Sequence, residues 1–342
     1  MSIFLLGIES SCDDTSAAII QNTKILANVT ANQEVHKKYG GVVPELASRA
    51  HQQNIIPVIE SALQSAKINK KQLDAVAFTR GPGLLGSLLV GTSFAKSFAL
   101  GLNIPLIEVD HLKAHILAHF ILGKKPRPVP EFPFLCLTVS GGHTQIILVS
   151  DHYTFEVIGQ TIDDAAGEAF DKSAKIMGFP YPGGPVIDQF AKNGDPHKFT
   201  FPEPNIPALN YSFSGLKTSF LYFIRDQLKI NEHFIEENKP DLCASIQYAI
   251  IKTLMTKLSL ASTQTGIRQI AIAGGVSANS LLRKELLHAQ NKKNWKVYIP
   301  EFEYTTDNAA MIAVAGYYKY LNKDFASQNT TPYARSTFQL QL

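Results

Sequence analysis

The chain has 342 residues, 45% of them hydrophobic and 18% charged, which is typical of a globular protein with room for two domains. Its net charge of +3 is too small to indicate nucleic-acid binding by itself. The cysteines Cys12, Cys136 and Cys243 have no short spacing, which argues against a disulfide framework or a zinc knuckle and favours a reducing, cytoplasmic compartment.

The apolar stretches do not predict membrane insertion. Residues 1–6 are apolar but lack a basic region and are soon followed by Glu9, so we predict a strand rather than a signal peptide. The long apolar region 84–109 is interrupted by Lys96 and Pro105, among others, so we expect no transmembrane span.

The first part of the chain alternates between strands and helices. A buried strand leads through a polar turn into two further strands, and a helix containing Pro57 follows. We expect this proline to bend the helix or to split it. A fourth strand ends in Gly81-Pro82-Gly83 and leads into an apolar helix. The predicted ranges are strands 4–9, 17–20, 24–30 and 73–79, and helices 45–67 and 84–100.

A histidine-bearing helix is predicted directly after the next apolar strand. Asp110 is a good N-cap residue, so the helix should begin at His111. Residues four apart lie on one helical face, about 6 Å from each other, so two imidazoles can reach one ion. His111 and His119 are about 12 Å apart along the axis and cannot share a metal. The candidate pair is therefore His111 with His115, or His115 with His119.

The proline-rich segment 123–133 is the best candidate linker, and we place a domain boundary near it. Beyond it the opening pattern returns, with a strand, the turn Ser140-Gly141-Gly142, and two more strands. Later a strand over 270–273 leads through Gly274-Gly275 into a helix, as the fourth strand does through its glycines. This duplication predicts an α/β protein with two actin-like lobes and a nucleotide cleft between them.

The predicted lobes are interleaved along the chain. We expect the N-terminal lobe to span residues 1–125 and to be completed by a C-terminal helix within 308–342. The C-terminal lobe should span 126–307, with a mainly helical insertion over about 160–238. A long amphipathic helix over 239–263 should carry Pro240 in its first turn.

Two turns in matching positions are candidates for phosphate or metal–phosphate binding. The turn after the first strand carries Asp13 and Asp14, although aspartate is also an ordinary turn former. In the second, Gly141 and Gly142 let the backbone approach an anion, and neighbouring hydroxyls can donate. Because the turns match, we favour phosphate binding.

Several polar groups have both a functional and a structural interpretation. Asp171 lies on an acidic helix face beyond the first turn, where the helix dipole does not account for it. Gly183 and Gly184 can form a flat wall for a sugar or base, or a plain turn. Asn279 can bind a nucleoside or cap a helix. Asp307 can cap the apolar helix over 309–320 or serve as a third metal ligand.

These ordered motifs resemble the tRNA threonylcarbamoyladenosine transferase family, the TsaD/Gcp proteins once labelled O-sialoglycoprotein endopeptidases. The resemblance covers nearly the whole chain. It rests on the segments 7–15, 81–83, 110–115, 139–144, 170–172, 181–185, 212–217, 274–279 and 306–309.

The resemblance implies an actin-like ATPase fold and a specific transfer reaction. The threonylcarbamoyl group of threonylcarbamoyl-AMP would pass to the exocyclic N6 amine of the adenosine 3′ of the anticodon, in tRNAs that read codons starting with A. One metal, Fe²⁺ or in some members Zn²⁺, would be held by His111, His115 and Asp307. Threonylcarbamoyl-AMP, or ATP or ADP, would occupy the cleft. The implied substrate contacts are Thr138, Val139, Ser140, Gly141, Gly142, Asp171, Gly184, Asp188 and Asn279.

A carboxylate of the first turn would take the proton from the attacking amine. Asp13 and Asp14 are both candidates, and Asp14 departs from the family, in which many members carry glutamate. The implied partners are tRNA, a smaller actin-like paralogue (TsaB) that we expect to dock on the N-terminal half, and a small P-loop ATPase (TsaE). No membrane is implied.

Other functions are weighed against this one. A zinc protease is disfavoured because Leu112 stands where the glutamate base would be. An actin-like ATPase or kinase of unknown substrate is the alternative, although a kinase gives no reason for a histidine pair. Candidate tRNA phosphate contacts are Lys124, Lys125, Arg127 and the run 292–296, for which a solvated basic face is at least as good an explanation.

Overall fold

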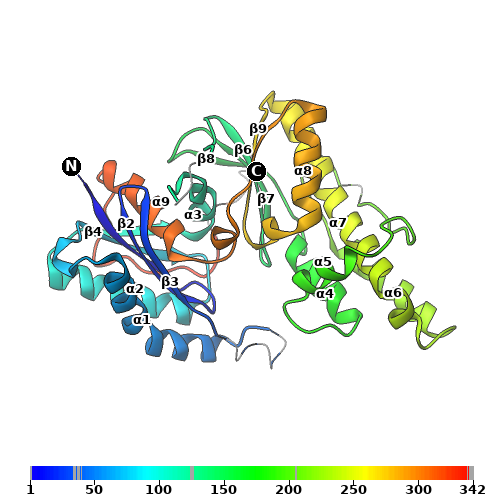
Figure 1. Ribbon diagram of the computed structural model, residues 1–342, viewed down its shortest axis with the longest axis horizontal. Coiled ribbons are helices and arrows are strands. Elements are labelled where there is room, and N and C mark those ends of the chain that lie inside the picture. Colours follow the sequence, from blue (N-terminus) through cyan, green and yellow to red (C-terminus); the bar gives the residue numbers. More distant parts are fainter. Residues whose placement is uncertain are drawn as a thin grey trace. The chain divides into compact units, whose positions relative to one another are not determined.

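The computed structural model describes residues 2–33, 36, 39, 41–123, 127–204, 206–336 and 338. The chain divides into two compact units (Figure 1). Unit 1 consists of Met1–Pro130 together with Pro300–Phe338, and the described part of unit 2 is Glu131–Ile299. Each unit contains one five-stranded sheet.

The sheet of unit 1 has the strand order β3-β2-β1-β4-β5. The hairpin strands β1, β2 and β3 are antiparallel, and β4 and β5 join β1 in parallel. Parallel neighbours need a crossover, which two helices supply here. The strands are β1 (Phe4–Glu9), β2 (Thr15–Gln21), β3 (Lys24–Ala31), β4 (Ala75–Gly81) and β5 (Leu106–Asp110).

Helices cover both faces of this sheet. Leu6 and Ile8 belong to a hydrophobic cluster with α1 (Pro44–Ala66) and α2 (Leu85–Leu102). On the other face, a Cβ at Gly7 would lie 2.5 Å from the carbonyl oxygen of Ala309, the first residue of α9 (Ala309–Leu321). A glycine here therefore lets the C-terminal helix pack directly on β1. Figure 1 shows α9 on one side of the strands and α1 and α2 on the other.

Of the described helices, α2 alone is long and apolar enough to cross a membrane by length and composition, and 33% of its apolar window is buried. It packs against α1 and β4 within unit 1. Core helices of soluble proteins meet the same criterion, so this single helix is weak evidence for a membrane.

The sheet of unit 2 repeats the arrangement of unit 1. Its order, counted from the antiparallel edge, is β8-β7-β6-β9-β10. Here too three antiparallel strands are followed by two parallel ones, which confirms the predicted duplication. The strands are β6 (Phe134–Val139), β7 (Thr144–Val149), β8 (Phe155–Gln160), β9 (Gln269–Ala273) and β10 (Lys296–Tyr298).

Helices between β8 and β9 form most of the remaining core of unit 2. Large aromatic side chains such as Tyr211, Phe213 and Phe220 are fully buried among them. The helices are α4 (Ala166–Ile176), α5 (Gly183–Ala191), α6 (Ser214–Leu228), α7 (Phe234–Thr265) and, after β9, α8 (Ser280–Lys293). Short 3₁₀ helices are Lys70–Gln72, Ala118–Phe120, Gly275–Ala278 and Phe302–Tyr304.

Two prolines lie inside helices. α1 continues through Pro57, so the helix is not split there. The expected place of Pro240 is wrong, because α7 begins at Phe234 and Pro240 lies in its interior rather than in its first turn. A proline inside a helix costs about 3 kcal/mol. Burial of several apolar side chains on the same helix, at about 1.5–3 kcal/mol each, offsets that cost.

Candidate functional site

The helix that carries the histidines is positioned by its N-cap. Oδ1 of Asp110 accepts hydrogen bonds from the backbone N–H groups of Leu112 and Lys113, each at 3.0 Å. Its other carboxylate oxygen accepts a hydrogen bond from the hydroxyl of Tyr333 at 2.6 Å. The predicted cap is confirmed, and α3 (His111–Leu117) begins with His111 at the end of β5.

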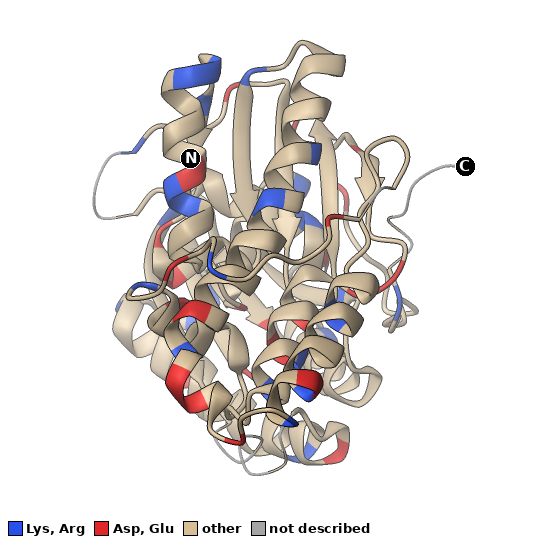
Figure 2. Ribbon diagram, turned by 90° about the vertical axis from the view of Figure 1, so that its right-hand side faces the viewer, with Lys and Arg blue, Asp and Glu red and all other residues tan. Residues whose placement is uncertain are grey.

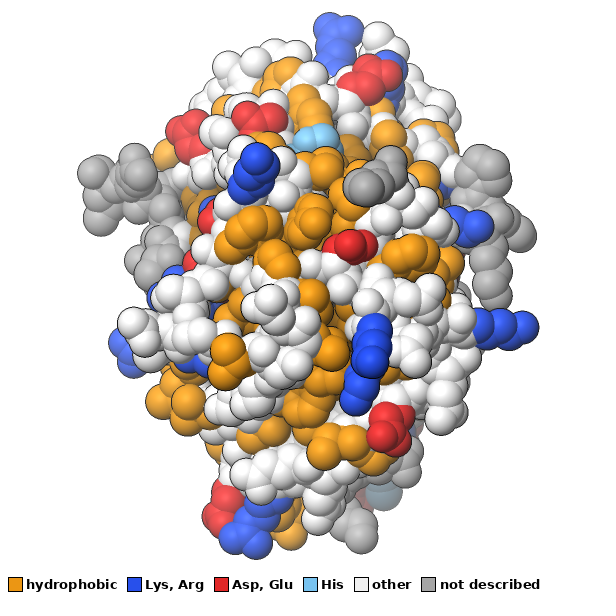
Figure 3. All heavy atoms as spheres, turned by 90° about the vertical axis from the view of Figure 1, so that its left-hand side faces the viewer, with side chains coloured by type: hydrophobic (Ala, Val, Ile, Leu, Met, Phe, Trp, Pro, Cys, Tyr) orange, Lys and Arg blue, Asp and Glu red, His pale blue; other side chains and the backbone are white. Residues whose placement is uncertain are grey.

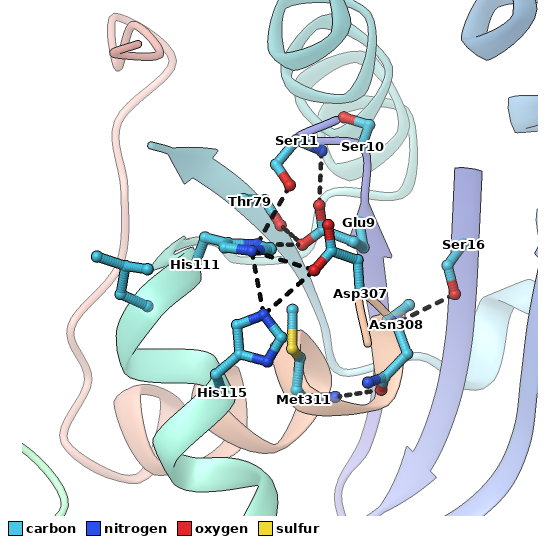
Figure 4. A network of polar contacts seen from close by, with 12 residues as sticks. Glu9, Ser10, Ser11, Ser16, Thr79, His111, His115, Asp307, Asn308 and Met311 are labelled. Atoms are coloured by element: carbon cyan, nitrogen blue, oxygen red, sulfur yellow. Dashed lines mark hydrogen bonds and ion pairs between the residues drawn. The ribbon is translucent and has the colours of Figure 1, made fainter. Parts of the chain in front are cut away.

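Three side chains of unit 1 converge on one point (Figure 4). Nε2 of His111 lies 3.2 Å from Nε2 of His115 and 3.4 Å from Oδ1 of Asp307. Nε2 of His115 lies 3.2 Å from the same carboxylate oxygen. The two histidines come from α3, whereas Asp307 comes from the segment just before α9. These three residues can hold a metal ion.

The geometry of this triad fits a divalent ion. Three ligand atoms at about 2.1 Å from one ion, in tetrahedral or octahedral positions, lie about 3.0–3.4 Å apart. The observed separations of 3.2–3.4 Å fall within this range. Two imidazoles and one carboxylate are also ligands of catalytic zinc and of non-haem iron, both of which keep positions open for substrate.

The structure shows which of the candidate histidines lie together and which residue caps α9. The group of possible ligands pairs His115 with His111, whereas His119 is buried in the 3₁₀ helix that follows α3. The capping interpretation of Asp307 is wrong, because Asn308 caps α9 by accepting a hydrogen bond from the backbone N–H of Met311 at 3.1 Å. The Asp307 carboxylate is thereby left to the histidines.

A fourth charged group, Glu9, completes the network at the end of β1. Its side chain is fully buried. Oε1 accepts a hydrogen bond from the backbone N–H of Ser11 at 2.5 Å, and Oε2 accepts one from the Thr79 hydroxyl at 2.6 Å. Oε2 also lies 3.1 Å from Nδ1 of His111 (Figure 4). No motif in the sequence assigned a separate role to Glu9, although a carboxylate ending a buried apolar strand is an unusual signal.

Charges within this network stabilise one another. Burial opposes the charged form of His111, but the attraction of Glu9 and Asp307 outweighs it and raises the pKa of His111 well above its usual value. Burial likewise opposes ionisation of Glu9 and Asp307, yet the charge of His111 lowers the pKa of both carboxyls. A cation in the triad would take over the charge of the imidazolium, so metal binding must displace a proton.

The carboxylates of the first turn lie next to this network. Burial raises the pKa of Asp14 to about 7, and the negative charges of Asp13 and Asp307 contribute further. His51 holds the turn, because its Nε2–H donates to the carbonyl of Cys12 at 3.0 Å and its Nδ1 lies 2.8 Å from the Thr15 hydroxyl. A carboxyl with a near-neutral pKa is well suited to take up a proton at physiological pH.

The predicted substrate-binding residues all lie in unit 2. Thr138 and Val139 end β6, and the turn that follows contains Gly141 and Gly142. A Cβ at either glycine would meet nothing within 4 Å, so the protein's own packing does not require glycine there. Both glycines are exposed. This turn therefore leaves room for a ligand beside its backbone.

The remaining predicted residues connect the loops around α5 and α8. Oδ1 of Asp171 accepts hydrogen bonds from the backbone N–H groups of Gly183 and Gly184 at 2.8 and 3.2 Å. Oδ1 of Asp188 accepts from the backbone and the hydroxyl of Ser280. Asn279 caps α8 and donates to Gln247 at 2.7 Å. Each has a structural task, and their role in substrate binding stays a prediction.

Comparisons with known proteins show which family the chain belongs to. Residues 24–314 match the family model described as tRNA N6-adenosine threonylcarbamoyltransferase. A protein of that name from Christiangramia forsetii is 62% identical and spans 98% of both chains, and one from Riemerella anatipestifer is 63% identical and spans 97% of both. Component A of the Acidaminococcus fermentans (R)-2-hydroxyglutaryl-CoA dehydratase shares the actin-like fold, with a TM-score of 0.53, 16% identity, and coverage of 93% of this chain and 99% of that one. The chain belongs to the tRNA N6-adenosine threonylcarbamoyltransferase family.

Proposed function

We propose that this protein transfers the threonylcarbamoyl group of threonylcarbamoyl-AMP to the N6 amine of the adenosine 3′ of the anticodon, in tRNAs that read codons starting with A. The observation that carries the proposal is the triad His111, His115 and Asp307 in a chain of this family. Asp14 lies close enough for the charge of Asp307 to contribute to its raised pKa. The alternative of an actin-like ATPase or kinase of unknown substrate is not favoured by the comparisons.

We infer that the triad holds one divalent metal, Fe²⁺ or Zn²⁺. Imidazole nitrogens and a carboxylate oxygen bind both ions, so the donor set does not choose between them. A bound ion would supply a Lewis acid for the carbonyl oxygen of the threonylcarbamoyl group. The fit rests on the ligand separations described above and on the convergence of three ionisable groups in a largely buried place.

The carboxylates of the first turn are assigned to proton transfer. The N6 nitrogen attacks the carbamoyl carbon and forms a C–N bond, while the bond from that carbon to the phosphate oxygen breaks and AMP leaves with the electron pair. The proton lost by N6 goes to a carboxylate, for which Asp14 is supported by its pKa of about 7. Asp13, its neighbour, remains the second candidate. No covalent enzyme intermediate is needed, because the mixed anhydride is already activated.

The donor nucleotide is assigned to unit 2. The exposed backbone at Gly141 and Gly142 can donate N–H groups to phosphate oxygens. Thr138, Val139 and Ser140 lead into that turn. The other residues proposed to contact the donor are Asp171, Gly184, Asp188 and Asn279. Hydrogen bonds of Asp171 to Gly183 and Gly184, of Asp188 to Ser280 and of Asn279 to Leu282 brace the loops around α5 and α8.

The candidate phosphate contacts for tRNA are basic residues on two segments of the chain. Lys124 and Lys125 lie outside the described residues. Arg127 donates to the carbonyl of Ala118 at 2.7 Å, and Trp295 is buried, so both have structural tasks. Figure 2 shows basic and acidic residues interspersed over the helices that face the viewer. Among the candidates, Lys292 and Lys293 are exposed and are proposed for phosphate contacts, whereas the exposed Lys296 pairs with Glu131 at 3.2 Å and would have to exchange that partner.

We propose that the protein acts in the cytoplasm with two partner proteins, a smaller actin-like paralogue and a small P-loop ATPase. The paralogue is proposed to dock on α1 and α2. Ile56, Leu85 and Leu89 on these helices are 54%, 50% and 47% exposed. Figure 3, which shows the left-hand side of Figure 1, has hydrophobic side chains gathered on the face toward the viewer. Leu85→Glu with Leu89→Glu should abolish co-purification with the paralogue, whereas Ile230→Glu, on a residue 81% exposed in unit 2, should not. Equal retention of the paralogue by both variants would contradict this surface.

The test of the proposed function is reconstituted tRNA modification. Purified protein, its bacterial partners, tRNA, threonine, bicarbonate and ATP are assayed for threonylcarbamoyladenosine, and metal content is measured in parallel. His111→Ala should lose both product and metal while still unfolding in one cooperative transition, at a lower temperature because Glu9 loses its ion-pair partner. The matched control is His119→Asn, which removes a neighbouring histidine outside the triad and should keep both. An active His111→Ala variant, or no product from metal-loaded wild type with all partners, would refute the proposal.

A further inference from the structure

Glu9 is a buried carboxylate in a place where the strand around it is apolar. It is fully buried at the end of β1, directly after Ile8, which is itself 1% exposed. Burying a carboxylate is costly unless hydrogen bonds and charges satisfy it. The ion pair that the described residues give Glu9 is with His111, a proposed metal ligand. The position therefore calls for an explanation beyond packing.

Hydrogen bonds fix the carboxylate independently of the histidine. The backbone N–H of Ser11 donates to Oε1, and the hydroxyl of Thr79, on the neighbouring strand β4, donates to Oε2. Both donors belong to the sheet or to the turn that directly follows β1. Because the sheet holds these donors, Oε2 is already aimed when it meets Nδ1 of His111 at 3.1 Å.

This arrangement dictates which ring nitrogen of His111 carries its proton. An ionised carboxylate can only accept a hydrogen bond, so Nδ1 must be protonated to face Oε2. The Ser11 hydroxyl, 3.2 Å from the same nitrogen, can accept as a second partner. With the proton on Nδ1, the lone pair of a neutral ring lies on Nε2, the atom directed toward His115 and Asp307.

We propose that Glu9 is the positioning residue of the metal centre: it sets the tautomer and ring orientation of His111 so that Nε2 binds the ion. This inference rests on the proposed function, because it takes the triad to be a metal site. Such outer carboxylates orient a ligating histidine and raise its basicity. Glu9 itself does not touch the ion or the substrate in this assignment.

The second histidine provides an internal contrast. Nδ1 of His115 is buried and has no hydrogen-bond partner among the residues that the structure describes. The carboxylate that this ring meets among the described residues is that of the proposed ligand Asp307, 3.2 Å from Nε2. Among the described residues, therefore, no outer carboxylate fixes Nδ1 of His115, so the effect of losing Glu9 should fall on His111.

An amide cannot replace this carboxylate. Three donors, from Ser11, Thr79 and His111, converge on the two oxygens of Glu9. Glutamine has one acceptor oxygen, and its NH₂ group would face a donor whichever way it is turned. If the NH₂ faces His111, it favours the tautomer with the proton on Nε2, which blocks the metal. Glu9→Gln therefore changes few atoms and tests the proposal sharply.

The first experiment measures metal affinity rather than activity. Zn²⁺ is titrated against a competing chelator, and Co²⁺ spectra report the ligand geometry, for wild type, Glu9→Gln and Glu108→Gln. Glu108 is a matched control on β5, paired with Arg80 at 2.9 Å and outside the His111 network. Glu9→Gln should bind Zn²⁺ about 10- to 100-fold more weakly and Glu108→Gln within about twofold of wild type. Equal affinities for the two folded variants would overturn the proposal.

A second measurement needs no variant and covers the case in which Glu9→Gln does not fold. The histidine nitrogen NMR spectrum of the zinc-loaded wild type should show His111 with a protonated Nδ1 in a strong hydrogen bond and a metal-bound Nε2. A metal-bound Nδ1 would refute the inference. Failure of the two ideas is distinguishable: wild type that binds no metal rejects the proposed function, whereas wild type that binds metal with an unaltered Glu9→Gln affinity rejects only the role of Glu9.

Discussion

The two units share one sheet topology, and comparing equivalent positions shows how one plan supports two kinds of site. The last residue of β1, Glu9, pairs with Ser16 on β2, and the last residue of β6, Val139, pairs with Thr144 on β7. In both units a glycine after the parallel neighbour abuts the hairpin turn. A Cβ at Gly83 would lie 2.4 Å from the Ser11 carbonyl oxygen, and one at Gly274 would lie 2.6 Å from that of Val139.

The side chains at these equivalent turns differ in kind. Unit 1 places carboxylates at the end of β1 and in the turn, next to a histidine helix. Unit 2 places an apolar residue and two exposed glycines there, so its turn presents backbone. The fold thus places a turn at the same position in both units. Single residues decide whether that turn offers a ligand ionisable side chains or backbone N–H groups.

The largest expected effect is on the transfer rate and comes from the carboxylates in the turn of unit 1. Asp14→Asn removes the proposed base while keeping size and shape, and should reduce the transfer rate about 10²- to 10⁴-fold. In wild type, kcat/KM should increase with pH as Asp14 loses its proton. The midpoint of this increase should lie at or below about pH 7, because a bound cation lowers the pKa of Asp14 below its metal-free value. Measuring modification rates against pH checks both points. A rate for Asp14→Asn near that of wild type would transfer the role to Asp13.

The next effect compares a glycine in close contact, Gly274, with a glycine in open space, Gly142, within unit 2. Gly274→Ala forces a Cβ against the Val139 backbone at a φ of +86°, and should lower the free energy of unfolding by about 3 kcal/mol. Gly142→Ala has open space and should change it by less than about 0.5 kcal/mol. Urea unfolding of both variants is the measurement. Similar losses in the two would show that the contact at Gly274 is not what limits substitution.

A third effect should appear in unit 1 as a dependence on pH. The folded pKa of Asp14, about 7, lies above its unfolded value near 3.8, so the folded protein binds this proton more tightly. The contribution of Asp14 to the free energy of unfolding therefore falls as pH rises from about 4 to 7, by about 2 kcal/mol, because solvent screens part of the interactions of this half-buried group. In metal-free protein, Asp14→Asn should be as stable as wild type near pH 4 and more stable near pH 8. Unfolding curves at both pH values test this, and equal stability at pH 8 would contradict it.

The smallest expected effect concerns the hydrogen bond between Tyr333, near the C-terminus, and Asp110, the N-cap of α3. Tyr333→Phe removes the hydroxyl that donates to Asp110 at 2.6 Å, and should cost about 1 kcal/mol in unfolding free energy. The capping bonds to Leu112 and Lys113 use the other oxygen and should persist. Thermal unfolding with a parallel metal titration checks this. A loss of metal affinity comparable to that of His111→Ala would show that the segment does more than brace the helix.

Local signals in the sequence predicted much of this molecule. The spacing of four residues predicted that His111 and His115 share one helical face, and Asp110 predicted where α3 begins. Repeated strand–glycine–helix junctions predicted the duplicated fold. Each of these features depends on residues within a few positions of one another, where periodicity and capping preferences are strong.

What the sequence did not show depends on contacts between distant segments. Glu9 and Thr79 meet because β1 and β4 are parallel neighbours, although they are 70 residues apart. Asn308, not Asp307, caps α9, and one position decides between a structural and a metal-binding carboxylate. Pro57 is tolerated because the face of α1 beside it is buried against the sheet, which propensity alone does not reveal.

Unit 1 is built from two stretches of chain with all of unit 2 between them. During translation, β1 to α3 emerge first, then the continuous Glu131–Ile299, and only afterwards Asp307 and α9. A nascent chain can therefore complete unit 2 while the first sheet still lacks one of its covering helices. Asp307, the third proposed ligand, is synthesised just before that helix, so all three residues of the triad are present only near the end of synthesis. Ribosome-bound chains that stop before Pro300 would present the histidines without Asp307.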